Sequence, residues 1–224
     1  LKIDYCIDDY SGVATNLNNL AEFYYLEGDI NKAIELYLKS AFYEKLLGNF
    51  IGVADSYNNV ATVYAQTEFL FDAIRYHFKA LEIYERENYL PGIAMAKANI
   101  AHQLANMGKG NEALPYIKNS ISIRQKLKDN KGLAQSYTFM AIVLQSINKY
   151  EEAEKWFFEG INIALEFGNH RQIAASFHSQ AAFFLSINQP EKAIEYLLNS
   201  LEFAKDINYE ALIADILQNL HILY

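Results

Sequence analysis

A forty-residue period in the placement of alanine constrains this chain more than any other feature. A single globular core has no need of the same small residue at a fixed interval. A stack of similar repeats does need it, because each repeat packs only on its neighbours. Three rows keep the period: Ala21, Ala61, Ala101, Ala141 and Ala181; Ala33, Ala73, Ala113, Ala153 and Ala193; and Ala54, Ala94, Ala134, Ala174 and Ala214.

Residues 51–90 show how one repeat is built. Apolar residues from Val53 to Tyr64 recur at spacings of three and four, which is typical of one face of a helix. The pattern is interrupted at residues 66–68 and resumes from Phe71 to Tyr84. Each repeat is therefore predicted to hold a helix, a tight turn and a second helix.

The predicted turns carry residues that suit them. Glycine and asparagine tolerate the left-handed conformation that closes many helices, so a glutamate at such a position is expected to be strained. Glycines also recur in the connections between repeats, at Gly48 and Gly168. A further row of small residues predicts close contact between helices, at Ser40, Ala80, Ser120, Gly160 and Ser200. The mid-repeat turns hold Gly28, Glu68, Gly108, Asn148 and Asn188.

Composition excludes several classes of protein. The formal net charge of -8 disfavours nucleic acid as a direct partner, because phosphate binding needs clustered Lys and Arg. No apolar run approaches the roughly 18 residues that a membrane helix needs. A single cysteine, Cys6, excludes an internal disulfide and a cysteine-based metal site. Composition leaves cytoplasm and periplasm equally open.

The periodic residues resemble the tetratricopeptide repeat. Residues 51–90 supply that family's bulky and small positions at its offsets: Tyr57, Val60, Ala61, Tyr64, Ala73, His77 and Ala80. Lys97 and His221 depart from the pattern. The resemblance implies an all-α, right-handed superhelical solenoid of antiparallel helix pairs that binds a protein or peptide.

The period predicts one continuous array, with repeats at about 11–50, 51–90, 91–130, 131–170 and 171–210 and partial repeats at 1–10 and 211–224. Residues 1–7 align with the inside of a second helix, so we expect a slice of a longer protein. The long repeat resembles those of bacterial peptide-sensing regulators and of the sensor regions of two-component kinases. The segment Asp129–Ala134 looks much like the kinase sensor regions. A sensory or regulatory part of a larger bacterial signalling protein is therefore expected. The alternative is a scaffold that self-associates, as a homo-oligomer, through its open ends.

The resemblance also implies that the first helix of each repeat lines an inner, concave wall. Amide and hydroxyl groups there can bond the backbone of an extended or helical peptide. We expect Asn58→Leu to weaken binding without unfolding the array. The expected contact residues are Asn18, Glu22, Asn58, Asn59, Thr62, Asn99, His102, Gln135, Thr138, Gln145 and His178.

No catalytic, cofactor or metal site is predicted, so the chain is not expected to be an enzyme. His77 lies at a core position, and His102 and His178 are about two repeats apart, too far to share a metal. Residues 108–110 lack the flanking spacing of a phosphate loop. The acidic residues at 151–154 begin a helix, where they favour the helix dipole.

Overall fold

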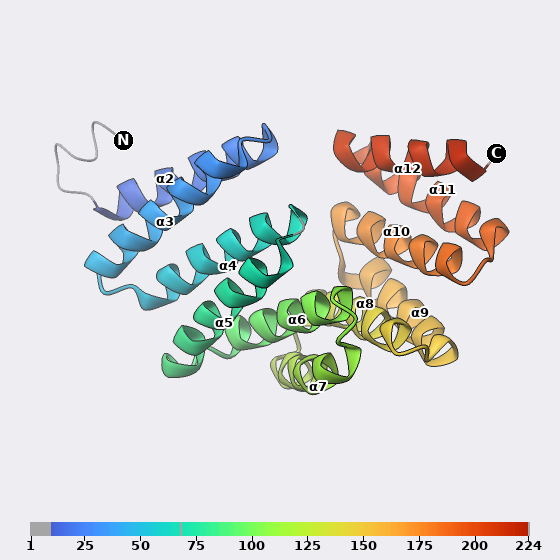
Figure 1. The fold of residues 1–224 in the computed structure, drawn as a ribbon, viewed down its shortest axis with the longest axis horizontal. Helices are drawn as coiled ribbons and strands as arrows, with labels where there is room; N and C mark the ends of the chain where they lie inside the picture. The colour runs from blue at the N-terminus through green and yellow to red at the C-terminus, as the bar shows by residue number, and fades with distance from the viewer. Residues whose placement is uncertain (1–9, 68, 224) are drawn as a thin grey trace. The chain divides into compact units, whose positions relative to one another are not determined.

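Helices begin at intervals of twenty residues in the computed structural model, which describes residues 10–67 and 69–223 (Figure 1). No strand occurs in these ranges, so the predicted all-α repeat of helix pairs is confirmed. The first helices are α2 (Tyr10–Leu26), α4 (Phe50–Gln66), α6 (Leu90–Asn106), α8 (Asn130–Ser146), α10 (His170–Ser186) and α12 (Glu210–Leu223). The second helices are α3 (Ile30–Leu46), α5 (Leu70–Arg86), α7 (Gly110–Leu127), α9 (Tyr150–Phe167) and α11 (Pro190–Asp206). The predictions for residues 1–7, Cys6 and Glu68 lie outside the described residues.

The chain divides into two compact parts, the N-terminal part, Leu1–Met107, and the C-terminal part, Gly108–Tyr224. Within each part every helix packs on its neighbours in sequence, as Figure 1 shows. First helices also touch one another, α4 with α6 and α8 with α10. The single continuous array remains a prediction.

The turn residues adopt the left-handed conformation that the sequence predicts. In the turn after α2, Gly28 has φ +82° and the Asp29 N–H donates to the Tyr24 carbonyl at 2.9 Å, which satisfies a carbonyl that the helix end leaves open. Gly168 differs, because it is extended, with φ -79° and ψ 169°. Among the described residues, the others with positive φ are Gly48, Asn88, Gly108, Lys128, Asn148, Asn188 and Asn208.

The alanine rows lie in the core. Fourteen of the fifteen alanines are at most 1% exposed, as the packing argument requires. Ala214 on α12 is exposed, because no second helix follows α12 within the described residues to cover it. The period therefore reports contacts between helices, and each alanine is buried where its neighbouring helix is present.

The further row of small residues, which runs from Ser40 to Ser200, brings the two helices of a repeat together. The Ser40 hydroxyl donates to the Ala14 carbonyl at 2.9 Å, and the Ser200 hydroxyl donates to the Ala174 carbonyl at 2.8 Å. A methyl group on Gly160, in the same register, would lie 3.3 Å from the Ala134 carbonyl oxygen. Larger side chains at these positions would push the helices apart.

A pairing of large and small residues sets the contact between successive repeats. Tyr84 packs where a methyl group on Gly92 would overlap its ring, and a methyl group on Gly52 would lie 2.6 Å from the Glu44 carboxyl carbon. Where the second-helix residue is a buried alanine, the first-helix position holds a larger side chain. The pairs in chain order are Glu44 with Gly52, Tyr84 with Gly92, Arg124 with Gly132, Ala164 with Gln172 and Ala204 with Leu212.

This pairing predicts that Gly92→Ala destabilises the protein. Gly to Ala inside a helix normally stabilises by roughly 0.5–1 kcal/mol, but the added methyl group meets the Tyr84 ring. We expect the free energy of unfolding to fall by about 1–3 kcal/mol, measured by urea denaturation. In a Tyr84→Ala background the same change should no longer destabilise. A stabilising Gly92→Ala in the parent would contradict the pairing.

Candidate functional site

The predicted contact residues lie on the first helices, but they differ in how accessible they are. Glu22, Thr62 and Gln135 are exposed. Asn58 and Thr138 are buried, with 8% and 6% of their surfaces exposed. The half-buried ones are Asn18, Asn59, Asn99, His102, Gln145 and His178. The first helices therefore present a mixed face in which only part of the polar surface is open to a ligand.

Asn58 ties three helices of the N-terminal part together. Its Oδ1 accepts a hydrogen bond from Asn99 Nδ2 on α6 at 3.1 Å and lies 3.1 Å from Nδ1 of His77 on α5. Because Oδ1 can only accept, His77 Nδ1 carries the proton. Asn58→Leu would leave this buried N–H unpaired, at a cost of about 1–3 kcal/mol. The structure therefore revises our expectation that this variant spares the fold.

His77 is confirmed as a core residue, since only 1% of its surface is exposed. Burial lowers its pKa to about 3, and the charge of His102 adds a smaller decrease. His77 is therefore neutral in the folded protein at physiological pH. Its role is to pack and to donate one hydrogen bond.

A cavity of about 500 Å³ opens between α8 and α10 of the C-terminal part. Gln135 and Thr138 are predicted contact residues that line it, whereas the other two predicted on these helices make contacts elsewhere. Gln145 Nε2 donates to Ser186 Oγ at 2.9 Å, and His178 Nε2 lies 2.8 Å from the Asp215 carboxylate. The complete lining is Gln135, Thr138, Phe139, Asn169, Arg171, Gln172, Ala175, Ser176 and Ser179.

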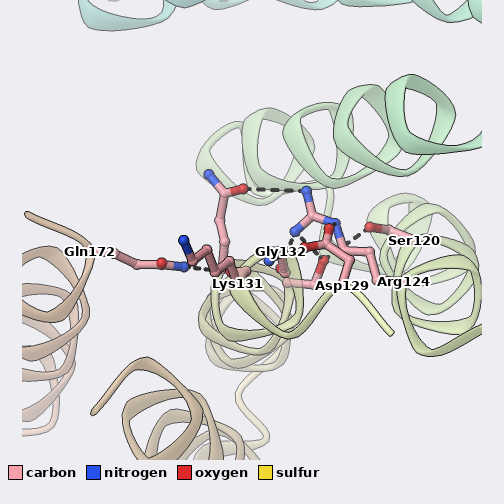
Figure 2. A network of polar contacts seen from close by, with 8 residues as sticks. Ser120, Arg124, Asp129, Lys131, Gly132 and Gln172 are labelled. Atoms are coloured by element: carbon pink, nitrogen blue, oxygen red, sulfur yellow. Dashed lines mark hydrogen bonds and ion pairs between the residues drawn. The ribbon is translucent and has the colours of Figure 1, made fainter. Parts of the chain in front are cut away.

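A buried arginine holds one wall of this cavity (Figure 2). Arg124 is 4% exposed and extends from α7 to the first turn of α8. It donates through Nη1 to the Gly132 carbonyl and to Ser136 Oγ, and through Nη2 to Gln135 Oε1 at 3.4 Å. Asp129, whose side chain caps α8, lies 3.8 Å from Arg124 Nε. These contacts orient Gln135, which lines the cavity.

On the α10 side of the cavity, Gln172 is linked to the first turn of α8. Its Nε2 on α10 donates to the Lys131 carbonyl on α8 at 2.6 Å, a contact drawn in Figure 2. Gln172 stands where the four earlier repeats have glycine, at positions 12, 52, 92 and 132, and it is paired with the small Ala164. Gln172 was not among the predicted contact residues, although its departure from these glycines is the signal that could have identified it. Gln135 is thus held by Arg124 of α7, and Gln172 is held by the first turn of α8.

The cavity offers hydrogen bonding rather than covalent chemistry. Its polar groups are amides, hydroxyls and one guanidinium, beside the apolar surfaces of Phe139 and Ala175. Among residues 10–67 and 69–223, no three His, Cys, Asp or Glu side chains gather closely enough to hold a metal ion. Over the same residues, no helix is both long and apolar enough to span a bilayer.

Comparison with known families identifies the repeats. Two models of the tetratricopeptide repeat match, one at residues 53–88 and one at residues 92–166. With the helix-pair architecture above, they assign the chain to the tetratricopeptide repeat family, whose fold is a scaffold for protein interaction. A comparison with curated proteins finds no match.

Solved structures share the fold at low sequence identity. BtubC from P. vanneervenii is 17% identical with a TM-score of 0.70, and the match covers 92% of this chain and 86% of that one. A Rap protein solved with competence and sporulation factor is 18% identical with a TM-score of 0.77, covering 89% and 56%. The Rap conjugation gene regulator of plasmid pLS20, solved with a Phr peptide, is 15% identical with a TM-score of 0.76, covering 91% and 56%. This chain thus spans little more than half the length of the two Rap proteins.

The buried imidazole predicts a pH-dependent stability. The unfolded chain binds a proton at His77 below its ordinary pKa of 6.5, whereas the folded protein stays neutral down to about pH 3. Stability from this group is complete above pH 6.5 and falls as the pH drops towards 3. Between pH 7 and pH 5 we expect a loss of about 2 kcal/mol from His77.

The matched variant is His77→Leu, because Leu197 occupies the same register in a later repeat. Urea denaturation at several pH values should show a shallower fall in stability for the variant than for the parent. Identical pH dependence in the two proteins would mean that His77 titrates normally in the folded state.

Proposed function

We propose that this chain binds a peptide segment along its first helices, with the cavity between α8 and α10 as a principal contact site. The observation that carries the proposal is that this cavity of about 500 Å³ opens between two first helices, which we expect on the inner wall from the family resemblance. The ligand would be an extended or helical segment of a protein or a free peptide.

The lining chemistry supports a peptide. Gln135 and Gln172 can donate to and accept from backbone amides, and Ser179 adds a hydroxyl. Phe139 and Ala175 offer apolar surface for a side chain of the ligand. The contacts of Arg124 and Lys131 hold the two glutamines before a ligand arrives, which lowers the entropy lost on binding.

The structural neighbours support a regulatory setting. One Rap protein of the same fold was solved with competence and sporulation factor. Another, named a conjugation gene regulator, was solved with a Phr peptide. We propose that this chain is the sensory or regulatory part of a larger bacterial signalling protein and is not itself an enzyme. The net charge of -8 agrees with a protein or peptide partner rather than nucleic acid.

The test begins by selecting binders from random short peptides displayed on phage. Ala175 is exposed and lines the cavity, so Ala175→Trp should fill the cavity without disturbing the core. Selected peptides should bind this variant about tenfold more weakly or worse, as measured by isothermal titration calorimetry.

The matched control is Leu198→Trp on α11, because this leucine is 47% exposed and does not line the cavity. It adds the same side chain and should leave affinity unchanged. Equal affinity for the parent and Ala175→Trp would show that the cavity is not the binding site. A library that yields no binder would contradict peptide binding itself.

A further inference from the structure

Gln180 is a polar residue at a core position. Earlier repeats hold apolar side chains there: Leu20, Val60, Ile100 and Met140. Gln180 is 1% exposed, and its buried Oε1 accepts no hydrogen bond from the described residues. An unsatisfied buried acceptor destabilises a fold, and an apolar residue would avoid that cost. We therefore expect a bound molecule to donate a hydrogen bond to the Gln180 oxygen.

A second cavity, of about 490 Å³, provides the place for such a donor. Gln180 on α10 lines it, together with residues of the second helices α9 and α11. It shares no residue with the cavity between α8 and α10. The other lining residues are Glu151, Glu154, Lys155, Phe158, Glu159 and Tyr196.

The charges around this cavity favour a cation. Three glutamates and one lysine line it, and Lys192 reaches Glu154 at 3.3 Å. Burial raises the pKa of Tyr196, and the neighbouring Glu195 and Glu154 raise it further. Tyr196 therefore keeps its proton, and negative charge remains in excess around it.

The lining selects an organic cation over a metal ion. Among the described residues, no three carboxylate or imidazole groups converge as metal ligands. The Phe158 ring, 57% exposed, and the Tyr196 ring add aromatic surface to the cavity. A guanidinium group combines positive charge, a flat face for aromatic stacking and five N–H donors. An ammonium group is a compact, strongly hydrated charge that fits such surfaces less well.

We propose that this cavity receives an arginine side chain of a protein partner. Its N–H groups donate to the Gln180 amide oxygen and to the glutamate carboxylates, and its flat face packs on Phe158. Hydrogen bonds between charged groups of this kind are stronger than neutral ones. The site is separate from the proposed peptide site, and neither proposal depends on the other.

The probe is N-acetyl-arginine amide, titrated into the protein while NMR follows the side-chain amide of Gln180 and the backbone amides of the other lining residues, which remain in every variant. These signals should shift and saturate. Gln180→Met should abolish binding, and it should also raise the melting temperature because the unsatisfied amide is gone. Met140 occupies the same register, so the variant is expected to fold. Glu159→Gln keeps Gln180 and should weaken binding by removing one carboxylate.

The controls separate charge from shape. Glu202→Gln removes an exposed acid of α11 that does not line the cavity and should not change binding. N-acetyl-citrulline amide has nearly the same shape without the charge and should bind about tenfold more weakly or worse. Equal binding of citrulline or of N-acetyl-lysine amide would overturn the assignment to arginine. No shift with arginine, or a less stable Gln180→Met, would overturn the site.

Discussion

The structure depends on the close approach of neighbouring helices at buried small residues. Hydroxyls of Ser40 and Ser200 reach the backbone of the facing helix, which is possible only where both surfaces are small. Between repeats, Gly92 leaves room for Tyr84 in the same way. Because these contacts recur every forty residues, they fix the helices and leave the remaining first-helix positions free to vary. Binding specificity can then change without loss of the fold.

The residues that break the period are the ones with individual roles. Arg124 takes a position that is tyrosine or alanine in neighbouring repeats, and it holds the first turn of α8. His77 takes a position that is aromatic or aliphatic in the other repeats, and it forms a hydrogen bond with Asn58. Gln180 replaces an apolar core residue and lines a cavity. In a repeated structure such departures are informative, because the other repeats show what packing alone would select.

The sequence predicted the helices and most turns, because apolar spacing and turn residues act locally. It could not predict that Gly168 is extended, since one glycine suits several backbone conformations. The contact residues were harder to predict from the sequence. Asn58 and Gln135 are both amides on first helices, yet Asn58 is tied to His77 and Asn99 while Gln135 lines a cavity. Which polar groups pair across helices depends on side-chain geometry that the period does not encode.

We propose that a peptide binds in the cavity between α8 and α10. The most direct measurement is a set of nuclear Overhauser contacts between a selected peptide and methyl groups of the protein. The account predicts contacts from the peptide to the methyl groups of Thr138 and Ala175, which line this cavity. Contacts confined to outer methyl groups, such as those of Leu198 on α11, would contradict it.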